Sequence, residues 1–211
     1  MIITADILNK ITPSIKGKHA DDIAAALNII LPVYKMDVPT IFHEFWANVL
    51  EESWEMGKFV ENLNYKTESI VKTWPTRFAN VSLALPYAHN PQKLANKVYG
   101  GRMGNIQPND GWDFRGSGPI QITGRDTITL FILYLNKLTG INRSVYETAQ
   151  LLRTDISVGI HSACWFFTKV KNLIPLAISD RMIEIVRRIN GGTTGLSQRL
   201  AYYDACKKWV L

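Results

Sequence analysis

Six of the fourteen glycines in this 211-residue chain lie between residues 100 and 118, a segment that no regular helix can span. Glycine at this density indicates tight turns or close approach of the backbone to a ligand. A phosphate-binding loop is disfavoured, because the segment has neither a Gly-Lys-Ser/Thr ending nor a strand-loop-helix G-x-G-x-x-G pattern. The next five residues, Pro119 to Thr123, are apolar and β-branched at alternate positions, which predicts a brief strand or extended segment.

The rest of the chain has helical patterns, and it shows no internal repeat and no low-complexity linker. We expect helices over 20–31, 40–56, 156–168 and 180–189, and a last one from Leu196, with Pro32, Gly57 and Gly191 as end signals. The predicted fold class is therefore α+β and mainly α-helical. The length suits one domain, residues 1–211, which can have two lobes.

The helix expected over 40–56 carries a carboxylate on its apolar side. Its apolar residues recur mostly at intervals of four or seven, which defines one core-facing stripe. At about 100° per residue, Glu52 falls within roughly 20° of that stripe, whereas Glu44, Glu51 and Glu55 fall to a side that water can reach. His43 is likewise expected to face solvent.

Burial disfavours the charged form of a carboxyl group, and a general acid must be neutral before it acts. Glu52 is therefore a candidate proton donor. The alternative is a structural glutamate satisfied by a buried arginine or a backbone amide. Nine residues further on, Glu61 lies in a polar loop, where a carboxylate stays ionised and can activate water. Two carboxyl groups in unlike environments are the acid/base pair that breaks glycosidic bonds.

The net charge of +6 favours approach to polyanions, but the Lys and Arg residues are scattered, so charge alone does not choose among nucleic acid, membrane and cell wall. The two cysteines cannot form a four-ligand zinc site, and Cys164 is expected as a buried thiol. His161 is expected as a core histidine. Neither a signal peptide nor a membrane-spanning stretch is evident, which predicts synthesis in the cytoplasm.

Several segments together resemble the family 19 chitinase-like lysozymes of bacteriophages, in the same order from about Ile41 to the C-terminus. They are Glu52-Ser53, residues 61–65 (ENLNY), residues 95–105 (ANKVYGGRMGN), residues 110–124 (DGWDFRGSGPIQITG), and residues 189–196 (INGGTTGL) followed by Arg199.

The resemblance implies a lysozyme-like fold with two lobes around a substrate cleft, and roles for seven residues. Glu52 would be the general acid, Glu61 the base, and Thr123 the hydroxyl that helps hold the attacking water. Gln121 and Tyr65 would contact sugar, and Asn190 and Arg199 would line the cleft and support the carboxylates. The family inverts the anomeric configuration, which requires the two carboxyl groups to lie roughly 6.5–9.5 Å apart. It needs no metal and no cofactor.

Three positions depart from the family pattern. Glu51 stands where histidine is frequent, Thr127 where an Asn-aromatic pair usually begins, and Thr194 where asparagine is frequent. We expect altered substrate affinity rather than lost chemistry.

These features predict an endolysin that cleaves the β-1,4 bonds between N-acetylmuramic acid and N-acetylglucosamine in peptidoglycan. It would be a monomer, made in the host cytoplasm and released to the wall through a holin-type lesion, with no nucleic-acid partner and no membrane insertion. The alternatives are a chitinase, a non-catalytic wall-binding relative, and a basic nucleic-acid-binding protein. The last is disfavoured because no binding motif is present.

Overall fold

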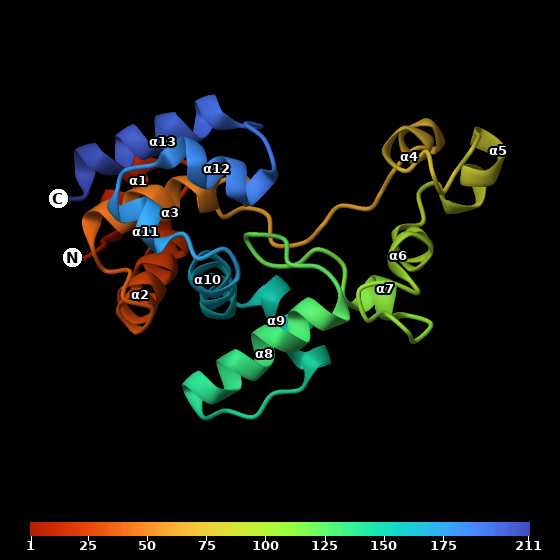
Figure 1. Ribbon diagram of the computed structural model, residues 1–211, viewed down its shortest axis with the longest axis horizontal. Helices are drawn as coiled ribbons and strands as arrows, with labels where there is room; N and C mark the ends of the chain where they lie inside the picture. The colour runs from red at the N-terminus through yellow and green to blue at the C-terminus, as the bar shows by residue number, and fades with distance from the viewer. The chain divides into compact units, whose positions relative to one another are not determined.

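The computed structural model describes all 211 residues, and its regular secondary structure is almost entirely helical (Figure 1). No named strand is present, and the extended structure is limited to two isolated bridges, from Val60 to Ser117 and from Ser117 to Ile122. The predicted mainly α-helical fold is confirmed. No helix is long and apolar enough to cross a membrane.

The chain divides into two compact units. The first comprises Met1–Phe59, Gly118–Ile120 and Thr154–Leu211. Its elements are α1 (Ala5–Ile11), α2 (Gly17–Val33), α3 (Pro39–Glu52), α10 (Ile156–Trp165), the π-helical turn η2 (Phe166–Val170), α11 (Ile174–Ile178), α12 (Met182–Asn190) and α13 (Leu196–Trp209).

Helix α3 is the central element of the first unit. Every residue from Ile41 to Leu50 is buried, because α13, α11 and α12 all pack against this helix (Figure 1). A helix covered on all sides buries its polar residues together with its apolar ones. This explains why the wheel misplaced Glu44 and His43, which are both buried rather than solvent-facing.

Helix α3 begins at Pro39, one residue before the expected start, and it ends at Glu52 and not at Met56. The Ser53 hydroxyl donates to the Val49 carbonyl at 2.6 Å and accepts from the Met56 amide at 2.8 Å, so side-chain bonds replace the next helical ones. The backbone then turns through three left-handed residues, Trp54, Glu55 and Met56. Glu52 is thereby the last residue of the helix and stands beside an irregular turn.

Other predicted helix ends in the first unit are close to the observed ones. Helix α2 includes Pro32 in its last turn instead of stopping before it. Helix α12 ends at Asn190, and Gly191, with a φ of 71°, supplies the left-handed cap. The predicted long helix over 156–168 is α10, which changes into the π-helical turn at Phe166.

The second unit comprises Val60–Ser117 and Gln121–Arg153. Its elements are α4 (Thr67–Thr73), α5 (Val81–Ala84), the 3-10 turn η1 (Leu85–Tyr87), α6 (Pro91–Tyr99), α7 (Asp110–Asp113), α8 (Arg125–Thr139) and α9 (Val145–Thr154). Leu63, Ile70, Phe78, Leu94 and Val98 lie in one of its core clusters.

The glycine-rich segment packs tightly within the second unit. A Cβ at Gly111 would lie 2.6 Å from the Ala95 carbonyl oxygen, so only glycine lets α7 approach α6 this closely. The buried Asp110 carboxylate accepts from two backbone amides and from Arg125. These bonds fix the loop that leads to the isolated bridges, and the predicted strand over 119–123 is reduced to the bridge residue Ile122.

Candidate active site

Glu52, at the C-terminal end of α3, is held by two side chains from the last part of the chain. The guanidinium of Arg199, on α13, donates from Nη2 to Glu52 Oε1 at 2.5 Å. In the amide orientation that satisfies both neighbours, Asn190 donates to the same Oε1 at 3.0 Å and accepts from Arg199 Nη2 at 2.9 Å. The structure thus brings together three of the residues predicted for the site.

Both donors converge on one oxygen of Glu52. No protein group forms a hydrogen bond to Oε2, and 27% of the Glu52 side chain is exposed. Oε1 is therefore fixed by two donors, whereas Oε2 has no bond to a protein group. Arg199 is the buried arginine partner that the alternative of a structural glutamate predicts.

Arg199 is itself anchored from the other direction. Its side chain is 3% exposed, and its Nη1 donates at 2.8 Å to the side-chain oxygen of Asn48, one helical turn before Glu52. Asn48 in turn donates to the Glu44 carbonyl at 2.7 Å. Sequence reasoning missed Asn48, although a polar residue four positions before Glu52 on a helix is a readable signal.

In the second unit, Glu61 is held by two donors. The Tyr99 hydroxyl donates to Oε1 at 2.6 Å, and the Gly116 amide donates to Oε2 at 3.0 Å. Both bonds satisfy an ionised carboxylate. Burial, and then the bond to Glu61, raise the pKa of Tyr99 above its usual range, so its hydroxyl stays a proton donor. Tyr99 lies in the motif that carried the resemblance, but its role was not predicted.

Gln121 lies close to this carboxylate, and Thr123 is bonded to the backbone of Gln121. A Cβ added to Gly116 would come within 2.9 Å of Gln121 Oε1 and 3.1 Å of Glu61 Oε2, so these groups crowd one glycine. Gln121 has a left-handed backbone, with a φ of 50°, and its carbonyl accepts from the Thr123 hydroxyl at 3.1 Å. This arrangement explains the glycine at position 116.

Tyr65 is placed differently. Its ring makes an edge contact with Trp74, at 5.2 Å between ring centroids, and packs against the core cluster of the second unit. The side chain is half-buried. A role in sugar contact stays a prediction.

His43 and Glu44, two polar residues expected at the surface, are buried in α3. His43 lies within hydrogen-bond distance of the Val210 carbonyl, 2.8 Å from its Nε2, and burial lowers its pKa. Glu44 is completely buried, and neither carboxyl oxygen has a hydrogen-bond partner of good geometry. Burial, and then the negative charge of Asp180, raise the pKa of Glu44 to about 8. A pKa of about 8 favours the protonated form of Glu44 at pH 7.

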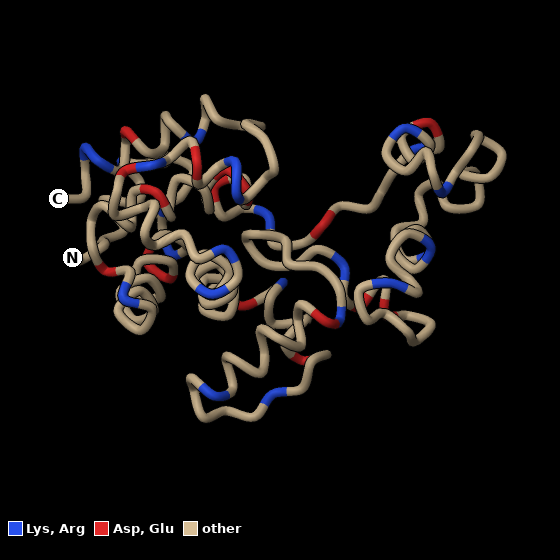
Figure 2. The backbone as a smooth tube through the Cα atoms, viewed as in Figure 1, with Lys and Arg blue, Asp and Glu red and all other residues tan.

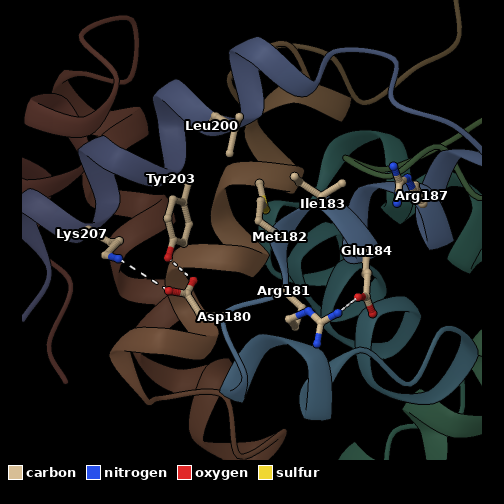
Figure 3. Close-up of a pocket in the computed structure, with 9 residues that line it drawn as sticks. All are labelled: Asp180, Arg181, Met182, Ile183, Glu184, Arg187, Leu200, Tyr203 and Lys207. Atoms are coloured by element: carbon tan, nitrogen blue, oxygen red, sulfur yellow. Dashed lines mark hydrogen bonds and ion pairs between the residues drawn. The ribbon is translucent and has the colours of Figure 1, made fainter.

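A cavity of about 120 Å³ adjoins Glu52 in the first unit. The buried residues of its lining include Phe45, Val49, Ala163 and Phe167. The more exposed residues of the lining are Ile120, Phe166, Ile189, Glu52 and Asn190. A larger pocket of about 490 Å³ lies between α12 and α13 (Figure 3). There Asp180 accepts from Tyr203 and pairs with Lys207, while Arg181 pairs with Glu184.

The spread of the charged residues and the burial of Cys164 agree with the sequence. Lys and Arg are spread over the elements of both units, without a dense run (Figure 2). Cys164 and Cys206 are free and buried, as predicted for Cys164, and burial raises the pKa of both thiols above the usual range. No group of three or more His, Cys, Asp or Glu side chains could hold a metal ion.

Glu52 and Glu61 are two carboxyl groups held in different surroundings, the kind of pair that glycoside hydrolases use. The chain is 32% identical over 208 residues to a Glycosyl hydrolase family 19 domain-containing protein of Haemophilus influenzae, an alignment that covers 97% of this chain and 96% of the relative. No protein-family profile matches the chain. The chain belongs to glycosyl hydrolase family 19.

Proposed function

We propose that this glycoside hydrolase cleaves the β-1,4 bonds between N-acetylmuramic acid and N-acetylglucosamine in peptidoglycan, by single displacement with inversion. The observation that carries the proposal is the Glu52 carboxyl group, with one oxygen fixed by Arg199 and Asn190 and the other unbonded. A general acid needs this combination, because it must be positioned and must still deliver a proton.

Glu52 gives the proton on Oε2 to the glycosidic oxygen as the bond from that oxygen to C1 breaks. Glu61 accepts a proton from a water molecule, whose oxygen attacks C1 from the opposite face. The products are a free hydroxyl on the leaving sugar and a hemiacetal of inverted configuration. Exchange with solvent then returns the proton to Glu52 and removes it from Glu61.

The groups around Glu61 suit the role of base. Tyr99 and the Gly116 amide donate to the carboxylate and hold it in place, while the Thr123 hydroxyl is a candidate to bind the water. Gln121 is a candidate to contact the sugar. No metal or cofactor takes part in this scheme.

Peptidoglycan is favoured over chitin because the net charge of +6 attracts the chain to an anionic wall. We further propose that the protein is an endolysin, made in the host cytoplasm and released to the wall through a holin-type lesion. It would act as a monomer.

The test is incubation of the protein with purified Gram-negative peptidoglycan, followed by mass spectrometry of new reducing ends. The wild type should produce reducing-end N-acetylmuramic acid. Glu52→Gln and Glu61→Gln should each lower the rate by roughly 10²–10⁴-fold. Activity on chitin oligomers alone would reassign the polymer, and wall binding without new reducing ends would make the protein a non-catalytic wall binder.

A further inference from the structure

The cavity beside Glu52 has an apolar lining, which proton transfer by Glu52 does not require. Its inner lining is apolar and buried, from Phe45 and Val49 on α3, Ala163 on α10, and Phe167 on the π-helical turn. π-helical turns of this kind occur frequently at functional sites. Here the turn supplies two of the aromatic rings of the lining, Phe166 and Phe167.

The polar groups of the lining are few and mostly engaged. Asn48 donates to the Glu44 carbonyl and accepts from Arg199, and Asn190 bridges Glu52 and Arg199. This leaves Glu52 Oε2 as the polar atom without a protein partner beside an otherwise apolar space. A ligand group suited to this cavity is therefore small and ends in an apolar atom.

The size of the cavity limits its occupant. Its volume of about 120 Å³ is below the roughly 150 Å³ of an apolar cavity that holds benzene, and a pyranose ring with its hydroxyls would not fit. The amino sugars of the proposed substrate carry an N-acetyl group at C2, which ends in a methyl. The lactyl group of N-acetylmuramic acid continues into the stem peptide, so it cannot end in this cavity.

The position of the cavity selects which sugar places its acetyl group there. C2 adjoins C1, the carbon that bears the bond to be cut, on the sugar that becomes the new reducing end. On the leaving sugar, C2 is separated from the reacting oxygen by C3 and C4. An acetyl group held beside Glu52 therefore belongs to the sugar that supplies C1.

We propose that this cavity, lined by Phe45, Val49, Ala163, Phe167 and Ile189, binds the N-acetyl methyl of the sugar that supplies C1 and so selects 2-acetamido sugars at the bond that Glu52 protonates. The inference rests on the proposed function for its substrate class. It assigns a role in specificity to residues that take no part in proton transfer.

The test uses glycan strands that are chemically N-deacetylated and then re-acylated with acetyl, propionyl or butyryl groups. The wild type should cut the acetyl strands best. Strands with free amines should lose roughly 10–200-fold in kcat/KM, the range for a small apolar group leaving a hydrophobic pocket. Ile189→Ala enlarges the cavity from its outer side and should move the preference towards propionyl and butyryl strands.

Ile183→Ala is the matched control. It is the same substitution on the same helix, but Ile183 lines the larger pocket (Figure 3). It should keep the wild-type order of substrates. Equal cutting of all strands by the wild type would overturn the inference and leave the proposed function intact. An unchanged order in folded Ile189→Ala would overturn it as well.

Failure to cut any strand would refute the proposed function, and a binding measurement then still decides the inference. An N-acetylglucosamine oligomer with ¹³C-labelled acetyl methyls is added to the protein. The inference predicts one methyl resonance shifted by the aromatic rings, with magnetisation transfer to Phe45 or Phe167 ring protons. Binding without such transfer, or no binding, would overturn it.

Discussion

Replacing Glu44 by glutamine should make the protein's stability nearly independent of pH between 6.5 and 8.5. The Glu44 carboxyl group is completely buried and has a pKa of about 8, against an ordinary value of 4.5. The folded state therefore binds a proton that the unfolded state releases above pH 4.5. Stability that is fully present below pH 4.5 is lost as the pH rises, and the loss is complete just above pH 8.

The size of this loss follows from the interval between the two pKa values. At about 1.4 kcal/mol per pH unit, the whole interval corresponds to a loss of roughly 5 kcal/mol in the free energy of unfolding. About 2 kcal/mol of it falls between pH 6.5 and 8. The neighbouring groups change the stability in other pH ranges. Because their pKa values are lowered, His43 affects the free energy of unfolding below pH 6.5, and Asp180 affects it below pH 4.

The assay is urea unfolding followed by circular dichroism at pH 6.5, 7.0, 7.5 and 8.5. Wild type should lose stability steadily across the series, while Glu44→Gln should stay level and become the more stable protein at pH 8.5. Asp21→Asn, at an exposed position on α2, is the control and should follow the wild type. Parallel curves for Glu44→Gln and wild type would show that Glu44 is ionised at neutral pH, contrary to this reasoning.

Three further predictions concern the contacts of the site and the thiols. Arg199→Leu should lower kcat by at least tenfold and destabilise the fold by roughly 3–5 kcal/mol, because Asn48 and Glu52 lose their buried partner. Arg199→Lys should restore stability more than kcat. Equal recovery of both quantities would assign Arg199 to the fold alone. Tyr99→Phe should move the acidic limb of the pH–rate profile to higher pH, since the carboxylate of Glu61 loses a donor, and an unmoved limb would refute this. A thiol reagent should modify neither Cys164 nor Cys206 within minutes in the native protein, and both in denaturant; rapid native labelling would show that their burial is incomplete.

The sequence was informative where structure depends on local chemistry. Gly191 and the apolar period before it predicted the end of α12, and the glycines of residues 100–118 predicted a tightly packed irregular segment. Glu52 stood out because a carboxyl group on an apolar stripe needs a partner. Its partners, Arg199 and Asn190, were predicted through the family resemblance and not from spacing, since about 140 residues separate them from Glu52.

The failures have a common physical cause in tertiary packing. The period of α3 suggested one buried face, but helices from the C-terminal part of the chain cover the others as well, so His43 and Glu44 are buried. The early end of α3 depends on the Ser53 hydroxyl and a left-handed turn, which residue preferences do not favour. The bond from Tyr99 to Glu61 joins residues 38 apart and has no local signal.

The most direct test of the acid/base assignment is the configuration of the first product. Short glycan strands are cut in a deuterated buffer while proton NMR records the anomeric region during the first minutes, before mutarotation mixes the anomers. We expect the α-anomer to form first from the β-linked substrate and Glu52→Gln to suppress its formation. Initial formation of the β-anomer, or undiminished cutting by Glu52→Gln, would contradict single displacement with Glu52 as proton donor.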